Sequence, residues 1–379
     1  MTYDTKARRE TPLALKLKDR IRNAGPISVA EFMRVCLHDP EYGYYVKQPA
    51  IGRAGDFITA PEISQIFGEL IGLWCAVVWQ QMGAPARVNL VELGPGRGTL
   101  MRDALRAAHK VPGFVAALDV HLVEQSEPLR RAQERTLAGC GVPFSFHASA
   151  GGLLSGEDHL GRDPVILVAN EFLDTFGVQQ FLFDGLTWRA RKIGLDAEGN
   201  LEFVDCAADD HRPRSLPLGV VPQEGAIFEE AVDGPLFAAV EFGRCSSMRP
   251  FAALLIDYGH QSTSFDDTLQ AVAGHHPVSP FHAPGETDLT VQVDFAQFAH
   301  ACRNAKDGPL AVDGPLTQGE FLGRLGIVER ASRLMSANPA MAAGIEMSVA
   351  RLIAPQGMGS RFQAIGVRSP VLPKLPGFD

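Results

Sequence analysis

A glycine-rich turn at residues 94–98 constrains the fold of this chain more than any other feature. It follows residues 88–93, a short run that is apolar apart from two polar residues. Such a run predicts a buried parallel strand, and the spacing of apolar residues over 99–110 predicts a helix with Thr99 near its N-cap. The turn holds three glycines at alternate positions, Gly94, Gly96 and Gly98. Because glycine adopts positive φ and has no Cβ, a ligand can lie against such a turn.

The spacing of these glycines separates two kinds of nucleotide-binding turn. A dinucleotide fingerprint runs G-x-G-x-x-G, with an acid about 20 residues later. Here the glycines run G-x-G-x-G, and Glu92 stands two residues before the first of them. This pattern resembles the first motif of the class I S-adenosylmethionine methyltransferases, whose glycines make room for the methionine part of the cofactor. A dehydrogenase is the alternative, and the glycine spacing disfavours it.

A second acid is expected at the same edge of the sheet. Residues 117–123 predict the next strand, which leads into Glu124. A carboxylate there can accept hydrogen bonds from both ribose hydroxyls, as acids do in other ribose-binding α/β sheets. The alternative is a solvated strand end without a ligand. With strand, helix and acid in register, we predict S-adenosylmethionine as the cofactor.

Acids also follow the most apolar of the predicted strands. Residues 164–169 lead into a polar group, Asn170, Glu171 and Asp174. In open α/β sheets ligands bind outside the carboxyl ends of the strands, so we expect this group at the mouth of the same site. The alternative is that the two acids only favour a helix N-terminus. Another central strand is predicted over 251–256, and it leads into Asp257.

Two further segments are candidates for loops around this mouth. A polar loop before the first strand of the sheet is expected to fold over the ligand, and it contains Gly55, Asp56 and Thr59. His276 belongs to a histidine pair in an irregular stretch. No third ligand stands at a useful spacing, so we predict no metal site and interpret His276 as a loop or substrate-contact residue.

Composition excludes several classes of protein. With 379 residues, 46% hydrophobic and 21% charged, the chain is expected to be globular, with one large domain and additions or with two domains. A net charge of −9 argues against nucleic-acid binding through phosphate neutralisation. No run of about 18 apolar residues predicts a membrane span, and six scattered cysteines indicate reduced thiols. The N-terminus lacks the pattern of a targeting segment, so we predict a cytoplasmic protein.

The rest of the chain predicts additions to the sheet. Amphipathic helices are predicted near the N-terminus, and a strongly apolar helix over 63–82. Alternating apolar and polar residues after residue 178 predict a β-meander. We therefore expect four parts: an N-terminal helical cap (1–86), the first part of the cofactor-binding core (87–185), a β-rich insertion (186–250) and the second part of the core (251–379).

The ordered set of motifs resembles the MidA-like family of S-adenosylmethionine-dependent methyltransferases. The set comprises G-D-F-I-T at 55–59, the turn from Glu92 to Gly98, N-E-F-L-D at 170–174, L-I-D-Y-G at 255–259, His276, D-L-T at 288–290 and V-D-F at 293–295. Mitochondrial members of that family are complex I assembly factors that symmetrically dimethylate an arginine. One departure is visible, since Phe176-Gly177 stands where the family usually has leucine-proline. This departure puts an identical substrate in doubt.

The resemblance implies a class I methyltransferase fold, which is α/β and Rossmann-like, with a mostly parallel seven-stranded sheet. It also implies methylation of a protein arginine, with a respiratory complex I subunit as partner. Carboxylates bind a guanidinium bidentately. Glu171 and Asp174 are the first candidates for binding the substrate guanidinium, and Asp257 is a weaker candidate. His276 is the candidate for removing the proton after methyl transfer. Three alternatives stay open: a small-molecule acceptor, a non-catalytic assembly factor that keeps the cofactor as a structural ligand, and the disfavoured dehydrogenase. A homodimer through 63–82 is a further hypothesis, although that helix is expected in the core.

Overall fold

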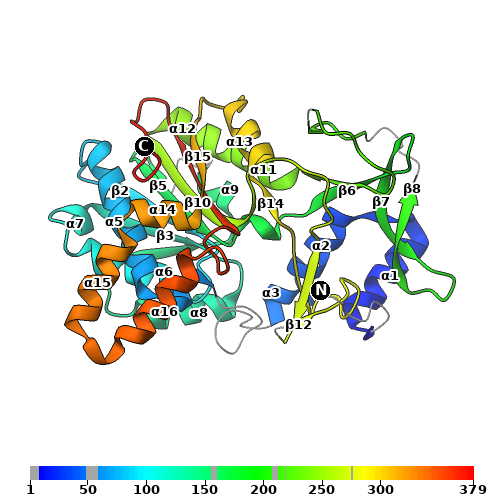
Figure 1. Cartoon of the computed structure of the whole chain (residues 1–379), viewed down its shortest axis with the longest axis horizontal. Helices are drawn as coiled ribbons and strands as arrows, with labels where there is room; N and C mark the ends of the chain where they lie inside the picture. The colour runs from blue at the N-terminus through cyan, green and yellow to red at the C-terminus, as the bar shows by residue number, and fades with distance from the viewer. Residues whose placement is uncertain (1–7, 48–58, 155–159, 207–211, 218, 275) are drawn as a thin grey trace.

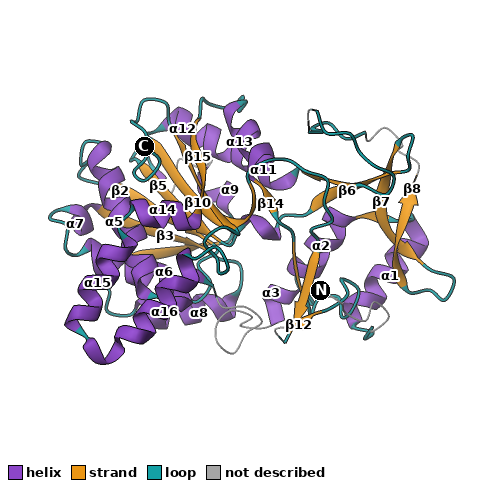
Figure 2. Cartoon of the chain, in the orientation of Figure 1, coloured by secondary structure: helices purple, strands orange, loops and turns teal. Residues whose placement is uncertain are grey.

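The computed structural model describes residues 8–47, 59–154, 160–206, 212–217, 219–274 and 276–379. In this part of the chain two lobes lie side by side (Figure 1). The larger lobe is an α/β sheet covered by helices, and the smaller lobe combines an antiparallel sheet with the N-terminal helices (Figure 2). No described helix is both long and apolar enough to cross a membrane.

The main sheet confirms the predicted fold class. Among the described residues, seven of its strands follow one another in the order β15-β16-β10-β5-β2-β3-β4, and β14 (Val293–Asp294) joins the end of β10. Five of these seven strands run parallel to one another, namely β2 (Val88–Leu93), β3 (Leu118–Val123), β4 (Phe144–His147), β5 (Val165–Asn170) and β10 (Phe251–His260). The antiparallel strand β16 (Phe362–Arg368) lies between β10 and β15 (Ala311–Thr317). The parallel strands place the ends of β2, β3 and β5 at one edge.

Helices bury both faces of this sheet, and alternate residues of each strand point to opposite faces. Leu90 packs on one side, under α5 (Gln65–Gln81), α6 (Thr99–Ala108), α14 (Gln318–Arg324), α15 (Ile327–Ala337) and α16 (Ala342–Ile353). Val91 packs on the other, under α9 (Ala150–Leu154), α12 (Gly243–Met248) and α13 (Phe295–Arg303). A sheet covered on both faces explains the near-continuous apolar runs of its strands.

The smaller lobe confirms the predicted β-meander. Its sheet contains β6 (Val178–Phe183), β7 (Trp188–Leu195), β8 (Leu201–Cys206), β9 (Ile227–Ala231) and the short β1 (Ile27–Ser28). The helices α1 (Pro12–Ala24) and α2 (Val29–His38) share one apolar core with this sheet. Ile27 pairs with Ile193, so the segment between α1 and α2 is joined to the meander by backbone hydrogen bonds.

The apolar cores divide the chain at places other than the expected boundaries. The segment predicted as one N-terminal cap is split, since α1 and α2 pack in the smaller lobe whereas α5 packs on the main sheet. The expected insertion likewise ends early, because Phe242 and Cys245 belong to the core of the main sheet. The physical reason is that an apolar helix packs against the nearest apolar surface that is still uncovered, whatever the position of the helix in the sequence.

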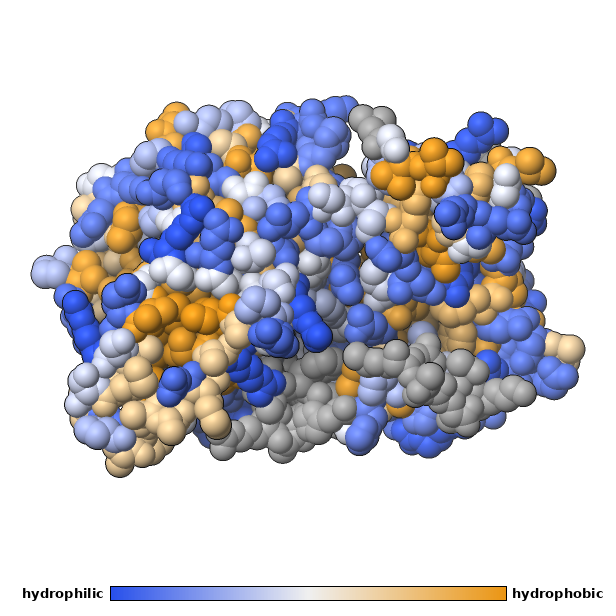
Figure 3. Space-filling view, viewed as in Figure 1, coloured by the Kyte–Doolittle hydropathy of each residue, from blue (hydrophilic) through white to orange (hydrophobic). Residues whose placement is uncertain are grey.

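The helix α5 is a core element, as its composition predicted. Twelve of its residues are buried, while Leu73 and Val77 are 37% and 41% exposed. Elsewhere on the surface, apolar side chains gather over α14 to α16, at the lower left of Figure 3; exposed members are Val328, Met341 and Met347. The homodimer therefore stays a prediction, since α5 is mostly covered by its own chain.

Candidate functional site

Two cavities open at the carboxyl ends of the parallel strands. The first, called here the turn cavity, has a volume of about 50 Å³ and is lined by residues from the segments 59–62, 92–100 and 170–171. The second, the main cavity, has about 350 Å³ and is lined by residues after β3, β4 and β5 and by Leu37, His38, Tyr45 and Val46. Both are lined by Gly94, Gly96 and Glu171, so they meet at the glycine turn.

The glycine turn has the backbone that its sequence predicted. Gly94, Gly96 and Gly98 all have positive φ, at 61°, 54° and 79°. A Cβ on Gly94 would lie 3.1 Å from the Phe172 ring, a contact that requires the ring to move. The Gln133 side chain donates a 2.7 Å hydrogen bond to the carbonyl of Gly96 and so anchors the turn on α8 (Glu127–Leu137). The turn therefore presents a fixed, concave surface of backbone atoms that glycine side chains do not obstruct.

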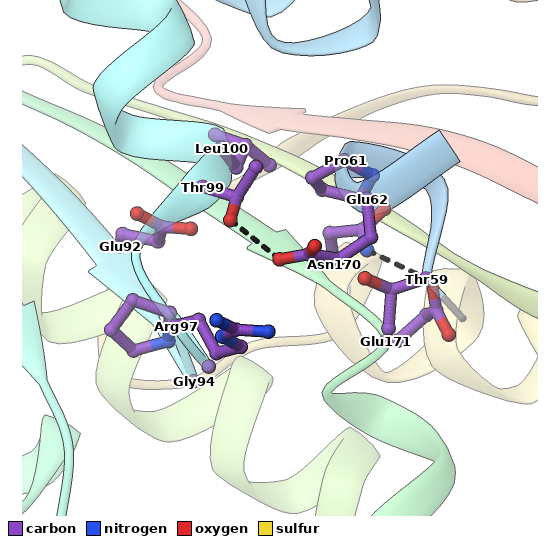
Figure 4. Close-up of a pocket in the computed structure, with 12 residues that line it drawn as sticks. Thr59, Pro61, Glu62, Glu92, Gly94, Arg97, Thr99, Leu100, Asn170 and Glu171 are labelled. Atoms are coloured by element: carbon purple, nitrogen blue, oxygen red, sulfur yellow. Dashed lines mark hydrogen bonds between the residues drawn. The ribbon is translucent and has the colours of Figure 1, made fainter. Parts of the chain in front are cut away.

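Glu92 brings a buried carboxyl group to the turn cavity (Figure 4). The residue is 3% exposed, and among the described residues its Oε2 has no hydrogen-bond partner. Burial raises its pKa to about 8, because no charge of opposite sign compensates for lost hydration. A cationic ligand group would supply that missing partner.

Glu124 lines the main cavity at the end of β3, where the ribose acid was predicted. The backbone N–H of Ser126 donates to its Oε1 at 2.8 Å, and Gln133 Nε2 to its Oε2 at 3.3 Å. Burial raises its pKa, and these donors partly oppose that shift. Each oxygen keeps a lone pair that could accept a ribose hydroxyl.

Glu171 stands between the two cavities in a strained conformation. Its φ is 53°, which is unusual for a residue with a side chain. Its Oε1 accepts from the backbone N–H of Ala60 at 3.2 Å and from Asn170 Nδ2 at 3.1 Å. Burial raises its pKa to about 7. Strain of this kind is held by the surrounding contacts and often marks a functional position.

Asp174 forms a second buried carboxyl beside Glu171. It is 6% exposed, and its Oδ1 has no hydrogen-bond partner among the described residues. Burial, followed by the charge of Glu171, raises its pKa to about 7. No lysine or arginine of the described chain pairs with either carboxyl. The two acids therefore form an acidic pair without a cation among the described residues; Glu171 lines both cavities, whereas Asp174 lines neither.

Asp257 has a different role from the one that the sequence suggested. Its Oδ2 accepts from the backbone N–H groups of three residues, Phe172 at 3.0 Å, Leu173 at 2.8 Å and Asp174 at 3.2 Å. Its Oδ1 accepts from the N–H of Tyr258 at 2.9 Å. Burial raises its pKa, while these four donors favour the charged form. The contacts thus make Asp257 a positioning residue that holds the turn carrying Glu171 and Asp174.

The remaining predicted site residues fall into three groups. Thr59 and Asn170 line the turn cavity as expected, whereas Gly55 and Asp56 lie outside the described residues. His276 is exposed in the two-residue strand β12 (His276–Pro277) and lines neither cavity. Its expected part in proton removal therefore finds no support in the geometry.

Three residues that line these cavities were not among the predicted site residues. Arg97 and Glu62 line the turn cavity, and Tyr45 lines the main cavity, where its ring stacks on His38 at 5.6 Å. Burial and then Asp288 and Asp174 raise the pKa of Tyr45. The only local signal was a cluster of tyrosines at 42–45, which is equally typical of a packed turn.

Comparisons with known proteins agree with this geometry. The family described as "Putative S-adenosyl-L-methionine-dependent methyltransferase" matches residues 70–315. A relative from Danio rerio, "Protein arginine methyltransferase NDUFAF7, mitochondrial", is 35% identical over 93% of this chain and 85% of its own. The protein of the same name from Homo sapiens is 34% identical over 93% and 82%. These names overturn the prediction of a cytoplasmic protein, because both relatives are mitochondrial.

A solved structure has the same fold over nearly the whole chain. It is a protein from Burkholderia thailandensis, crystallised with S-adenosyl-homocysteine. The two chains superpose with a TM-score of 0.82 and 24% identity, covering 98% of each. The likeness therefore extends to the smaller lobe as well as to the sheet.

Proposed function

Because this chain belongs to the family of S-adenosyl-L-methionine-dependent methyltransferases, we propose that it methylates the guanidinium group of an arginine in a protein. The observation that carries the proposal is the acidic pair of Glu171, which lines both cavities, and the buried Asp174 beside it. The relatives named as protein arginine methyltransferases support it.

The residues present suit the cofactor. Glu92 is a buried acid without a partner, which matches the ammonium of the methionine part. Glu124 offers acceptors for the ribose hydroxyls, and the main cavity of about 350 Å³ extends from it. When bound, S-adenosyl-L-methionine supplies a methyl group already activated by its sulfonium sulfur. The protein needs to supply alignment more than strong bases.

The acidic pair supplies that alignment for a guanidinium. A guanidinium is planar and permanently charged, and carboxylates bind its N–H groups in a defined plane. With pKa values raised to about 7, Glu171 and Asp174 hold about one negative charge between them near neutral pH. One arginine neutralises that charge, and the ionised carboxylate that binds it can receive the proton that the methylated nitrogen gives up. A lysine ammonium would match this arrangement less well, since it has no planar set of donors.

The protein substrate that we propose is a subunit of respiratory NADH dehydrogenase (complex I), with a homodimer as the enzyme's own state. The family resemblance motivates the first proposal, and the departure at Phe176-Gly177 bears on it, because Phe176 lines the main cavity. A small-molecule acceptor and a non-catalytic assembly factor are the competing functions. Glu171 and Asp174, which have no cationic partner among the described residues, favour an enzyme, because binding the cofactor as a structural ligand does not require them.

Methyl transfer to matched acceptors tests the proposal. The purified chain is incubated with isotopically labelled cofactor and with complex I subunits, and the methylated residue is located by mass spectrometry. We expect label on arginine, none after arginine is replaced by lysine, and at least a hundredfold lower kcat in Glu171→Gln. Asp184→Asn, which removes an exposed carboxylate from a hairpin, is the control. Full turnover with unchanged KM in Glu171→Gln would refute the assigned role.

A further inference from the structure

The smaller lobe supplies one wall of the main cavity through a short aromatic segment. This segment is α3 (Tyr44–Lys47), which lies on the side of the smaller lobe that faces the main sheet (Figure 1). Its Tyr45 lines the cavity together with His38, the last residue of α2. Glu171 lines the same cavity from the segment that follows β5. The two lobes therefore bring an aromatic ring and a carboxyl group to one cavity.

The ring of Tyr45 is held by two other rings. It stacks on the imidazole of His38, with the ring centroids 5.6 Å apart, and it meets the ring of the buried Tyr44 edge-on at 5.3 Å. Tyr45 also packs against the apolar core of the smaller lobe, while part of its surface stays exposed. A half-buried ring that its neighbours fix in place offers a preorganised flat surface to a ligand in the cavity.

Asp174 connects this ring with Glu171. Burial, then Asp288 and then Asp174 raise the pKa of Tyr45, so its phenol stays protonated beside these acids. Burial and then the charge of Glu171 raise the pKa of Asp174 in turn. Asp174 is thus a neighbour of both residues, and it is buried behind the cavity wall to which they belong. A cation bound by Glu171 comes within reach of the tyrosine ring.

The charged side chains that line the main cavity in the described chain are acidic. They are Glu124 and Glu171, and no described lysine or arginine lines the cavity. His38 is neutral near pH 7, because burial and then Arg34 lower its pKa. The face of an aromatic ring attracts a cation through its quadrupole, and a nearby carboxylate adds to that attraction. This wall of the cavity therefore suits an organic cation.

We propose that Tyr45 is a substrate-binding residue of the methyl transfer: its ring packs on the flat face of the substrate guanidinium, while Glu171 accepts N–H groups at the edge of that group. The inference rests on the proposed function and adds the smaller lobe to the acceptor site. Guanidinium groups stack on aromatic faces and bind carboxylates in their own plane. A ring and a carboxylate together select a group that is both planar and cationic.

Peptides that differ only in the charge of the planar group test the proposal by binding. The probes are the peptide Gly-Gly-Arg-Gly-Gly with blocked ends and the same peptide with citrulline, a neutral planar isostere, in place of arginine. NMR titration measures their dissociation constants with S-adenosyl-homocysteine bound. The variants are Tyr45→Phe, which keeps the ring, and Tyr45→Leu, which removes it. Tyr42→Leu is the matched control, since Tyr42 packs on the same apolar core but lines neither cavity.

We expect the wild type to prefer the arginine peptide at least about tenfold. Tyr45→Leu should weaken that peptide by about tenfold and the citrulline peptide by no more than about threefold, because only the cation interacts with the quadrupole of the ring. Tyr45→Phe and Tyr42→Leu should resemble the wild type, and the affinity for S-adenosyl-homocysteine should stay within about twofold in every variant.

Four results would overturn the proposal: unchanged arginine-peptide affinity in Tyr45→Leu, equal losses for both peptides, a parallel loss of S-adenosyl-homocysteine affinity, or a loss in Tyr45→Phe as large as in Tyr45→Leu. The third result would assign Tyr45 to the cofactor, and the fourth would assign the effect to its hydroxyl. A wild type that binds both peptides equally would instead count against guanidinium recognition itself, and so against the proposed function.

Discussion

Cofactor binding should release a proton from Glu92, and the size of the effect follows from its burial. Without ligand its pKa is raised to about 8, so about 0.9 of the molecules hold the proton at pH 7. An ammonium bound beside the carboxylate lowers that pKa, because an opposite charge favours the ionised form. The amino group of S-adenosyl-homocysteine belongs to a free amino acid, so it is protonated at pH 7. Free protein and ligand therefore carry about 1.9 protons at pH 7 and the complex carries one, which gives release of about 0.9 proton.

The same numbers determine how affinity depends on pH. The competent pair is an ionised Glu92 and a protonated amino group, so affinity rises roughly ninefold from pH 6 to 7 and about fivefold from 7 to 8. The other groups near the carboxyl are Arg97, Glu62 and Glu171 in the cavity and Cys75 of α5, whose thiol stays neutral because burial raises its pKa. None of these groups is expected to produce the same dependence of cofactor affinity on pH.

Titration of S-adenosyl-homocysteine in buffers of different ionisation enthalpy measures the proton count directly. Glu92→Gln should bind more weakly, release less than about 0.2 proton at pH 7 and show less than about twofold change from pH 6 to 8. Glu171→Gln is the control and should keep most of the wild-type release. A proton release near zero in the wild type would refute the reasoning, because Glu92 would then be ionised before the ligand arrives.

Two further predictions concern stability. A raised carboxyl pKa means that the folded state holds a proton that the unfolded state has already lost, so the ligand-free protein should lose stability as the pH rises from about 4.5 to 7. Glu171 alone should lower the free energy of unfolding by at most about 3 kcal/mol over this range. In calorimetry, Glu171→Gln should therefore have a higher Tm than the wild type at pH 8 but not at pH 4. A Tm equal to that of the wild type at both pH values would contradict this prediction. Asp257→Ala should cost about 3 kcal/mol in denaturant unfolding, because it removes the acceptor of four backbone N–H groups. It should also lower kcat while cofactor affinity stays within a few-fold, and loss of cofactor binding would show that the turn supports more than the acidic pair.

The sequence predicted the parts of the site that depend on local pattern and on a general rule of topology. Apolar runs with their glycine and acid endings located β2, β3, β5 and β10 to within a few residues. Because parallel strands bring their carboxyl ends to one edge, Glu92, Glu124 and Glu171 could be grouped without knowing any contact. The family motifs strengthened that grouping.

Only the tertiary structure decided which acid does what. Asp174 and Asp257 look alike in sequence, each following a strand, yet Asp257 accepts backbone hydrogen bonds from residues 83 to 85 positions away. Asp174 is left with an unused oxygen. Likewise the pairing of Ile27 with Ile193 assigned the N-terminus to the smaller lobe, and the exposure of His276 separated it from the acids. Local periodicity reports which face of an element is buried, whereas hydrogen-bond partners and pKa values depend on what the rest of the chain places against that face.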